Sequence, residues 1–332
     1  MSGPLQLEVS DLRVEIDSHL GVVRPIDGVS LEIAPGEAVG LVGESGSGKS
    51  MTLKSILGLL PPDAKVTSGS VVFDGTDLTR LPQSRLNKVR GRRIAMIFQE
   101  PMSALNPVMR VGNQIAEGPR VHLGLSRAQS MERATELMRR VGIPEPERRY
   151  RAFPHEFSGG MRQRVMIAMA LSCDPELILC DEPTTALDVT IQDQILRLLV
   201  QLCHETGTSL MFVTHDLPVV AQICHKVAVM YAGRIVERGT VQEVFTRPMH
   251  PYTLGLVQCS PEVDEVRQAL VPIPGSPPSL VSPPSGCRFH PRCQFAEDDC
   301  RTMDPPLRLL AGDRATACLH YERCLDQIGA ES

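Results

Sequence analysis

The sequence predicts an α/β fold with a parallel sheet core, an antiparallel β flank, a helical subdomain and a small Cys-rich C-terminal extension. Three observations lead to this prediction. A glycine-rich loop at residues 43–50 follows a short apolar run and precedes a helical pattern. Further along, apolar strand-like runs alternate with helical patterns, which is typical of parallel α/β sheets. After a Pro-rich stretch at residues 272–284, five cysteines fall within 38 residues.

The first third of the chain is expected to form mainly strands. Residues 5–16 and 28–33 alternate apolar and polar side chains, as half-buried strands of an antiparallel flank do. Pro35-Gly36-Glu37 is the predicted turn into an apolar strand at 38–42, and residues 51–60 have helical spacing. A further strand pair is expected at 69–73 and 94–98, with a turn at Asp74-Gly75 between them.

The middle of the chain alternates between helical and strand patterns. Residues 101–150 are helical and charged, and they belong to a subdomain predicted at about 100–165. Its clearest helix has an apolar stripe that Gly142 closes, formed by Ala134, Leu137, Met138 and Val141. Further predicted elements are strands at 177–180 and 210–213, a helix at 189–204 that stops at Gly207, and a hairpin at 227–236 turning at Ala232-Gly233.

The glycine-rich loop carries the first chemical signal. Gly43-Glu44-Ser45-Gly46-Ser47-Gly48-Lys49-Ser50 fits the phosphate-loop pattern G-x-x-x-x-G-K-[ST] at every fixed position. A polyphosphate needs several donors converging on it without intervening side chains, and glycine supplies that clearance. Lys49 is expected to reach the β- and γ-phosphates, and Ser50 to place its hydroxyl on Mg²⁺. A Gly/Ser-rich surface turn would not explain the flanking strand and helix, so the sequence predicts a nucleotide site.

Composition narrows the class of protein. The chain has 332 residues, enough for two or three cores, and its net charge of -5 argues against direct nucleic-acid binding. No apolar run approaches the roughly 18 residues that a membrane-spanning helix needs, and the first residues lack the features of a secretory signal. We therefore expect a cytoplasmic protein whose ten cysteines are not paired in disulfides.

A second constellation names a family. Phe157-Ser158-Gly159-Gly160-Met161-Arg162-Gln163 is followed by the apolar run 177–180 and then Asp181-Glu182. Together with the phosphate loop, Gln99, Ala186-Leu187-Asp188 and His215, in this order, these motifs resemble the ATP-binding-cassette (ABC) family over residues 5–239. The resemblance implies a phosphate-loop NTPase cassette that hydrolyses ATP.

The resemblance also assigns roles. Asp181 would hold Mg²⁺ through water, and Glu182, facing differently in an extended chain, would polarise or deprotonate the attacking water. His215 would contact the γ-phosphate and complete the catalytic pair with Glu182, while Gln99 would join the Mg²⁺ shell with Ser50. The full set of nucleotide-binding residues expected is Gly43, Ser45, Gly46, Gly48, Lys49, Ser50, Met51, Gln99, Asp181, Ser158, Gly159 and Gly160.

Two further expectations concern the nucleotide. In the ABC family Ser158 and Gly160 would bind the γ-phosphate of ATP held by the opposite subunit, so a monomer is expected to be nearly inactive. The family also stacks adenine on an aromatic side chain before the phosphate loop, but no Phe, Tyr or Trp precedes Phe73. His19, Leu20 or Val23 would contact the base instead, and ATP and GTP are expected to differ little in affinity.

Within the family, residues 92–107, 181–192 and 247–253 resemble the ATPases of dipeptide and oligopeptide importers. The resemblance implies a peripheral subunit on the cytoplasmic face of the cell (inner) membrane. Its expected partners are a second related ATPase, giving a heterodimer, two permease subunits contacted through residues 100–118, and an extracytoplasmic peptide-binding protein. Three alternatives stay open: an importer of nickel or another solute, a soluble ABC ATPase of translation or DNA repair, and a non-enzymatic regulatory subunit.

The C-terminal cysteines are expected to form a metal site. Their spacing matches none of the compact zinc patterns with paired C-x2-C knuckles. The resemblance to peptide importers implies a [4Fe-4S] cluster on Cys287, Cys293, Cys300 and Cys318, with Cys324 to spare. Zn²⁺ on the same ligands, with His290 or His320 replacing one thiolate, is the alternative, and cysteines without metal are a third possibility. The predicted domains are 1–240, the cassette; 241–285, a helix and Pro-rich linker; and 286–332, the Cys-rich module.

Overall fold

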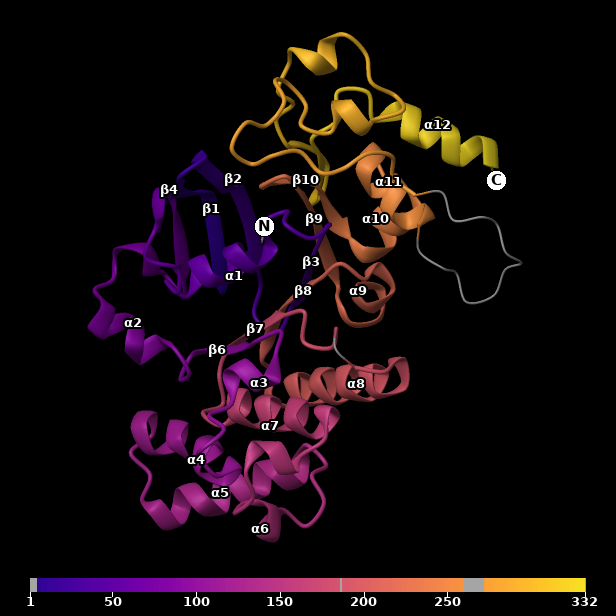
Figure 1. Ribbon diagram of the computed structural model, residues 1–332. Helices are drawn as coiled ribbons and strands as arrows, with labels where there is room; N and C mark the ends of the chain where they lie inside the picture. Colours follow the sequence, from indigo (N-terminus) through magenta and orange to yellow (C-terminus); the bar gives the residue numbers. More distant parts are fainter. Residues whose placement is uncertain (1–4, 186, 260–271, 332) are drawn as a thin grey trace. The chain divides into compact units, whose positions relative to one another are not determined.

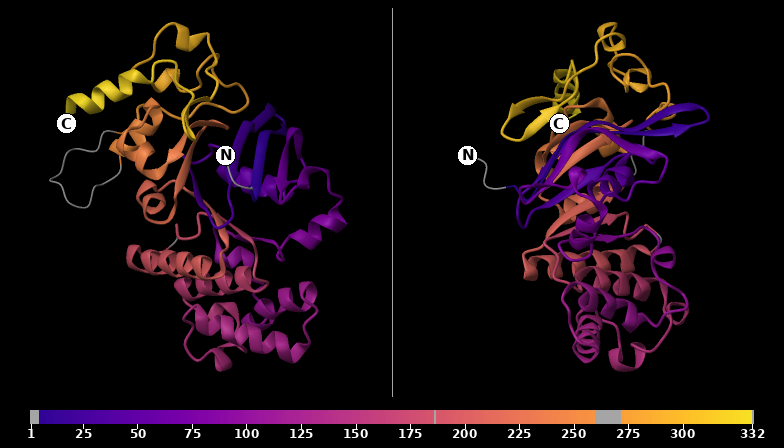
Figure 2. Two further views of the ribbon diagram at one scale, coloured as in Figure 1. Left: turned by 180° about the vertical axis from the view of Figure 1, so that it is seen from behind. Right: turned by 90° about the vertical axis from the view of Figure 1, so that its left-hand side faces the viewer.

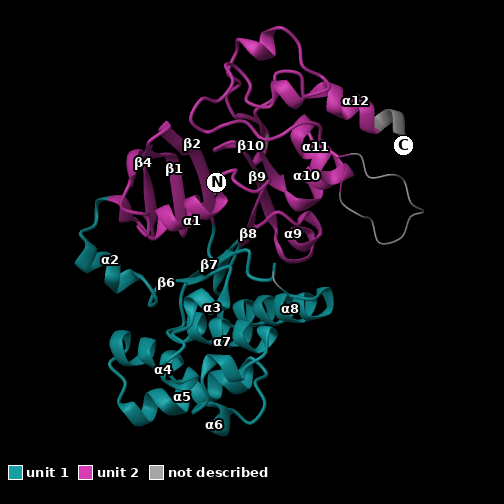
Figure 3. Cartoon of the chain, viewed as in Figure 1, with its two compact units in different colours: residues 1–4, 34–37, 80–212 teal, residues 5–33, 38–79, 213–332 magenta. Residues whose placement is uncertain are grey.

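The computed structural model describes residues 5–185, 187–259 and 272–331 (Figure 1). The chain folds into two compact units (Figure 3). Unit 1 contains residues 1–4, 34–37 and 80–212, and unit 2 contains residues 5–33, 38–79 and 213–332. Each unit is therefore built from separate stretches of the chain, and each is described by itself below.

The strands run, in chain order, β1 Leu7–Ser18, β2 Gly21–Ile33, β3 Ala38–Val42, β4 Ala64–Phe73, β5 Thr76–Asp77, β6 Ile94–Ile97, β7 Leu177–Asp181, β8 Ser209–Thr214, β9 Lys226–Tyr231, β10 Arg234–Thr240, β11 Arg308–Ala311 and β12 Arg314–Thr316. The α-helices are α1 Lys49–Ile56, α2 Gln83–Val89, α3 Pro101–Ala104, α4 Val111–His122, α5 Arg127–Arg140, α6 Pro146–Arg149, α7 Gly159–Leu171, α8 Val189–Thr206, α9 Leu217–Ile223, α10 Val241–Thr246, α11 Pro251–Gln258 and α12 Glu322–Glu331. Short 3-10 turns are η1 Leu78–Arg80, η2 Pro154–Glu156, η3 His290–Arg292 and η4 Asp299–Arg301.

Unit 2 contains an antiparallel sheet with the strand order β2-β1-β4-β5. Its long strands are the indigo and purple arrows of Figure 2. Its alternating sequence buries one face, as predicted, and Leu7, Leu12 and Ile33 are fully buried. The second predicted strand is longer than expected, because β2 begins at Gly21 and runs through Pro25. The antiparallel flank is therefore confirmed, and its second strand is longer than the sequence indicated.

Unit 2 also contains strands in the order β11-β12-β10-β9-β3. β3 pairs in parallel with β9, and all five of its residues are buried, as its unbroken apolar sequence requires. β9 and β10 form the predicted hairpin, whose turn has positive φ at both Ala232 and Gly233. β12, from the Cys-rich segment, pairs antiparallel with β10 and continues these strands.

Unit 1 combines strands with a group of helices. β6 and β7 are parallel neighbours, and β8 follows β7 in the strand order. Helices α4 and α5 contact each other and α7, and α3 and α8 also contact α7 (Figure 1). α5 begins with a capping box at Ser126 and Gln129, and α8 ends at Gly207 in the left-handed conformation. The predicted helical region at 101–150 and the predicted stop of α8 are both confirmed.

One strand prediction was wrong. Residues 69–73 and 94–98 do not form a pair: β4 pairs with β1 and β5, whereas β6 pairs with β7. Both segments have strand-like sequences, but apolar alternation does not specify which strand is the neighbour. Among the described helices, none is both long and apolar enough to cross a membrane.

Candidate functional site

The phosphate loop lies in unit 2 between β3 and α1, as predicted. Lys49 is almost fully buried, and its Nζ donates to the carbonyl oxygens of Gly43 at 2.7 Å and Glu44 at 2.9 Å. Two of the glycines are sterically required. A Cβ on Gly43 would lie 2.1 Å from the carbonyl oxygen of Met230, and a Cβ on Gly48 would lie 2.1 Å from that of Pro25.

Two further observations indicate that the loop can bind a polyphosphate. Gly46 has positive φ, and no atom lies within 4 Å of the place where its Cβ would be, so this part of the loop is open. Ser47 Oγ is buried and has no hydrogen-bond partner among the described residues. An open loop with Lys49 folded back on its carbonyls, next to the N-terminus of α1, has the donors that phosphate oxygens need.

His215 lies just after β8 and is exposed. Asp216 follows it as the N-cap residue of α9, and the backbone N–H of Asp216 donates to Thr214 Oγ1 at 3.0 Å. The end of a buried strand thus carries an accessible imidazole, the position that the sequence predicted. Its contact with a γ-phosphate stays a prediction.

The two acidic residues of the predicted site, Asp181 and Glu182, lie in unit 1. Asp181 ends β7 and is 5% exposed, while Gln99 follows the neighbouring strand β6. Because both strands are parallel, their carboxyl ends meet at one edge. Gln99 Nε2 donates to Glu182 Oε2 at 3.4 Å, and Thr185 Oγ1 donates to the same oxygen at 3.0 Å. The structure therefore brings Gln99, Asp181 and Glu182 together.

The backbone at Glu182 differs from our expectation. We expected an extended residue, but Glu182 has φ of +43°, in the left-handed region. Non-glycine residues adopt this conformation rarely, and it costs of the order of 1–3 kcal/mol. The strained turn redirects the Glu182 side chain after the end of β7, so its separation from Asp181 comes from this turn and not from strand alternation.

The signature segment also lies in unit 1. Ser158 is exposed and caps α7, where its Oγ accepts from the backbone N–H of Met161 at 3.4 Å. A Cβ on Gly160 would lie 2.9 Å from Ile191 Cγ2 on α8, so glycine lets the two helices approach here. The predicted cap at the start of an apolar helix is confirmed. Ala186, in the next motif, lies outside the described residues.

The Cys-rich segment lies in unit 2, and four of its cysteines line one small cavity: Cys287, Cys293, Cys300 and Cys318. These are the four predicted metal ligands. Cys324 is fully buried in α12. Burial, together with the charges of the other three cavity cysteines, raises the pKa of Cys318 to about 12. Buried thiols that lie close together become thiolates when a cation compensates their negative charges. These four cysteines are therefore a suitable set of metal ligands.

The remaining cavity residues bear on the type of metal. Phe289, Phe295 and Leu319 make the cavity partly apolar, and His290 and His320 also line it. The tightest described group of metal-ligating atoms is Asp299, Cys300 and His320, all within 4.8 Å of one another. His320 Nε2 lies 3.0 Å from both oxygens of Asp299. The cysteines and this group share Cys300, so the two sets of ligands are alternatives.

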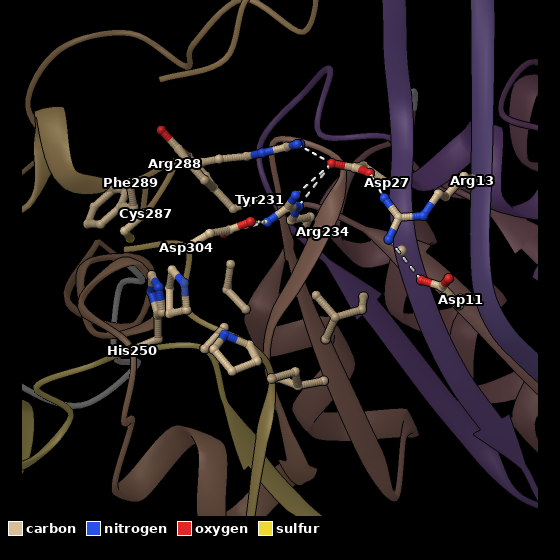
Figure 4. A pocket seen from close by; sticks show the side chains of 17 residues that line it. Asp11, Arg13, Asp27, Tyr231, Arg234, His250, Cys287, Arg288, Phe289 and Asp304 are labelled. Carbon is tan, nitrogen blue, oxygen red and sulfur yellow. Dashed lines mark hydrogen bonds and ion pairs between the residues drawn. The ribbon is translucent and has the colours of Figure 1, made fainter. Parts of the chain in front are cut away.

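A larger cavity of about 350 Å³ in unit 2 lies beside Cys287. Figure 4 shows three arginines directed toward Asp27, which is 8% exposed: Arg13, Arg234 and Arg288. Burial raises the pKa of Asp27, but the hydrogen bond from Arg234 and the three positive charges outweigh it, so the pKa lies below 3.8. Asp304 pairs with Arg234 at 2.5 Å. Because its members come from separate stretches of the chain, the network links β1, β2, β10 and the Cys-rich segment.

Sequence reasoning missed this network and the residues around Glu44. The side chain of Glu44 pairs with Arg292, which is 248 residues away, and its backbone N–H donates to Tyr252 Oη at 2.7 Å. Nothing in the local pattern at Asp27 or Arg292 marks these pairs. Their partners are distant in the sequence and come together only in the folded structure.

Comparison with known proteins adds to this geometry. A family model described as ABC transporter matches residues 26–185, and one described as oligopeptide/dipeptide transporter, C-terminal region, matches residues 236–300. The chain is 52% identical over 316 residues to a probable peptide ABC transporter ATP-binding protein of Sinorhizobium fredii, covering 95% of this chain and 94% of that protein. It is 47% identical over 312 residues to the oligopeptide transport ATP-binding protein OppD of Escherichia coli, covering 94% and 92%.

Solved structures agree on the fold. An ATP-binding cassette in a dimeric post-hydrolysis state bound to ADP and Pi matches with a TM-score of 0.64 and 29% identity. The match covers 71% of this chain and 98% of that one. The mixed sheets and helices described above are therefore those of a cassette NTPase.

Proposed function

Because this chain belongs to the ABC transporter family, as the ATP-hydrolysing subunit of a peptide or oligopeptide importer, we propose that residues of both units take part in ATP binding and hydrolysis. The observation that carries the proposal is the set of chemical groups that the units present. Unit 2 offers an open phosphate loop with Lys49, and unit 1 offers Gln99 beside Glu182 at the end of β7. Together they supply phosphate donors, metal-shell oxygens and a base.

Each residue has a role that its surroundings support. Lys49, folded over the loop carbonyls, would exchange those partners for the β- and γ-phosphates. Ser50, Gln99 and Asp181 would hold Mg²⁺, which neutralises charge on the phosphates when bound. Glu182, held by Gln99 and Thr185, would accept a proton from the attacking water, and the exposed His215 would fix the γ-phosphate.

A second subunit would complete the site. Ser158 and Gly159 are exposed at the start of α7, a helix of 13 residues, so the N-terminal dipole is open to an anion from another chain. This supports a dimer in which each signature segment binds the partner's γ-phosphate. We propose that the partner is a related but different ATPase. Each ATP would then lie between two non-identical chains.

Membrane partners follow from the family. Two permease subunits would dock on residues 100–118, where Met102 and Val108 are 49% and 80% exposed next to the helices of unit 1. Exposed apolar side chains on a short helix and a loop are suited to receive a helix from another protein. The subunit would thus sit on the cytoplasmic face of the inner membrane, and an extracytoplasmic binding protein would supply the peptide.

The Cys-rich cavity is our proposed [4Fe-4S] site, with Cys287, Cys293, Cys300 and Cys318 as ligands. A tetrahedral zinc site with Zn–S bonds of about 2.3 Å would bring its four sulfurs within about 4 Å of one another. Among the described residues, the group of ligand atoms within 4.8 Å of one another is Asp299, Cys300 and His320 instead. Four thiols spread around a partly apolar cavity suit a larger cluster better. Zn²⁺ on Cys300 and His320 is the second candidate.

The transport function is tested by reconstitution. Vesicles are prepared that contain this chain, its ATPase partner and the permeases. The binding protein is placed inside the lumen or outside, according to the orientation of the transporter in the vesicle membrane. We expect peptide movement only with ATP, and none with Lys49→Ala. Nickel transport without peptide transport under the same conditions would favour the other importer class of the family.

A further inference from the structure

Glu44 is the first variable residue of the phosphate loop, and the C-terminal part of the chain holds it on two sides. Its carboxylate pairs with both terminal nitrogens of Arg292, at 2.7 Å and 2.9 Å. Its backbone N–H donates to Tyr252 Oη at 2.7 Å. A bidentate pair fixes both position and angle, so Arg292 sets the side chain of Glu44 while Tyr252 sets its backbone.

Arg292 is itself rigidly held. Its side chain is 5% exposed, and its Nε donates to the carbonyl oxygen of Pro274 at 2.8 Å. The guanidinium lies 5.8 Å from the ring centre of Tyr231 and 5.9 Å from that of Phe289. Tyr231, Tyr252 and Phe289 contact one another, with ring centres 4.6 to 5.5 Å apart. This aromatic cluster leaves the Arg292 side chain few other places to go.

The backbone of Arg292 belongs to the wall of the cysteine cavity. It is the last residue of η3 and directly precedes Cys293, and Cys287 lies five residues before it. The N–H of Arg292 donates to the carbonyl oxygen of Phe289, and the N–H of Cys287 donates to that of Cys300. Any change that moves Cys287 or Cys293 therefore moves the segment that carries Arg292.

From these contacts we propose that Arg292 is a positioning residue for the phosphate loop, through which the state of the cysteine cavity sets the affinity for ATP. The inference rests on the proposed function, because it assumes that the loop binds ATP. An ordered Arg292 holds the loop in its open shape before the nucleotide arrives, so less ordering is needed on binding. When the cavity is disturbed, Arg292 no longer holds the loop in position. The loop then has to become ordered as ATP binds, which lowers the affinity for ATP.

The test compares two arginines of the same segment in the full-length chain. Arg292→Met breaks the pair with Glu44. Arg288→Met is the control, since Arg288 is also buried and also one residue from a cavity cysteine, but its partners are Asp27 and the carbonyl oxygen of Ala232, and not Glu44. The dissociation constant for Mg-ATP is measured by titration, and far-ultraviolet circular dichroism checks that each variant is folded. Wild-type binding is measured first.

We expect Arg292→Met to raise the dissociation constant roughly 3- to 30-fold, with Arg288→Met within about twofold of wild type. In the assembled transporter, KM for ATP should rise while kcat at saturating ATP stays unchanged. Arg292→Lys, which keeps the charge, should recover part of the affinity. If Arg292→Met fails to fold, Glu44→Gln tests the same pair from its more exposed side.

The link to the cavity is tested by a double-mutant cycle. Cys318→Ser should raise the dissociation constant for ATP in the wild-type background, but add little in the Arg292→Met background, since both act through one contact. Wild-type protein that binds no ATP would overturn the proposed function. Wild-type protein that binds ATP no better than Arg292→Met and Glu44→Gln, or fully additive effects of Cys318→Ser and Arg292→Met, would overturn this inference alone.

Discussion

Replacing Asp27 with Asn should destabilise unit 2 strongly. Asp27 on β2 accepts from three arginines that belong to β1, β10 and the Cys-rich segment. Asn keeps one acceptor oxygen and nearly the same volume, but it removes the negative charge. The arginines then repel one another around a buried amide, with Asp304 left to offset Arg234.

The size of the effect follows from burial. Arg288 and Asp27 are 9% and 8% exposed, so this pair is buried, and removing one partner of a buried pair costs about 3–5 kcal/mol. Arg13 is 43% exposed, and its share is at most about 1 kcal/mol. Because Asn retains part of the hydrogen bonding, we expect a loss of about 3 kcal/mol. For a unit of this size that is a fall in melting temperature of roughly 6–12 °C.

Thermal unfolding at several pH values measures this. The folded-state pKa of Asp27 is lower than 3.8, so its stabilisation is fully present above that pH and is lost as the pH falls through the folded-state pKa. The difference between wild type and Asp27→Asn should therefore be constant from pH 8 to pH 5 and shrink only in strong acid. Asp304→Asn is the control, because Asp304 is 53% exposed and its ion pair is with the partly exposed Arg234; it should cost at most about 1 kcal/mol. Equal melting temperatures for Asp27→Asn and wild type at pH 7 would refute the reasoning.

Three further predictions concern the nucleotide and the cysteines. Glu182→Gln should abolish ATP turnover but trap an ATP-bound dimer, visible by size-exclusion chromatography with Mg-ATP; normal turnover would show that Glu182 is not the base. Cys318→Ser should remove bound iron and visible absorbance, whereas Cys324→Ser, outside the cavity lining, should retain both; stoichiometric zinc in colourless wild-type protein would contradict the cluster. His19 and Leu20 are exposed in the β1–β2 turn, and neither is a Phe, Tyr or Trp that could stack on the base. The affinities for ATP and GTP should therefore differ by less than about tenfold in a competition titration. A large preference for ATP would point to another adenine contact.

Local signals predicted much of the fold. β3 was predictable because five consecutive apolar residues lie between a Pro-Gly turn and the phosphate loop. The β9–β10 hairpin was marked by Ala232-Gly233, and α8 by its apolar stripe and Gly207. The nucleotide motifs were equally local, since each is a short run whose residue types are dictated by chemistry.

Other features depend on contacts that a short stretch of sequence does not encode. The partner of β4 is decided by β1, far earlier in the chain, so the expected pairing with residues 94–98 failed. The left-handed backbone at Glu182 follows from how β7 ends, and glutamate itself gives no sign of it. The pairs of Glu44 with Arg292 and of Asp27 with three arginines join residues that no spacing rule connects.

The pairing of β12 with β10 has a consequence for how the protein is made. β10 is complete at Thr240, but its neighbour on that side begins at Arg314, which is 74 residues later (314 − 240). At typical translation rates a ribosome needs roughly 4 to 15 s to add them. For that time the nascent chain exposes an unpaired strand edge, the kind that associates with other chains. A frameshift or stop codon before Arg314 would make this state permanent, so such products should depend on chaperones or be degraded.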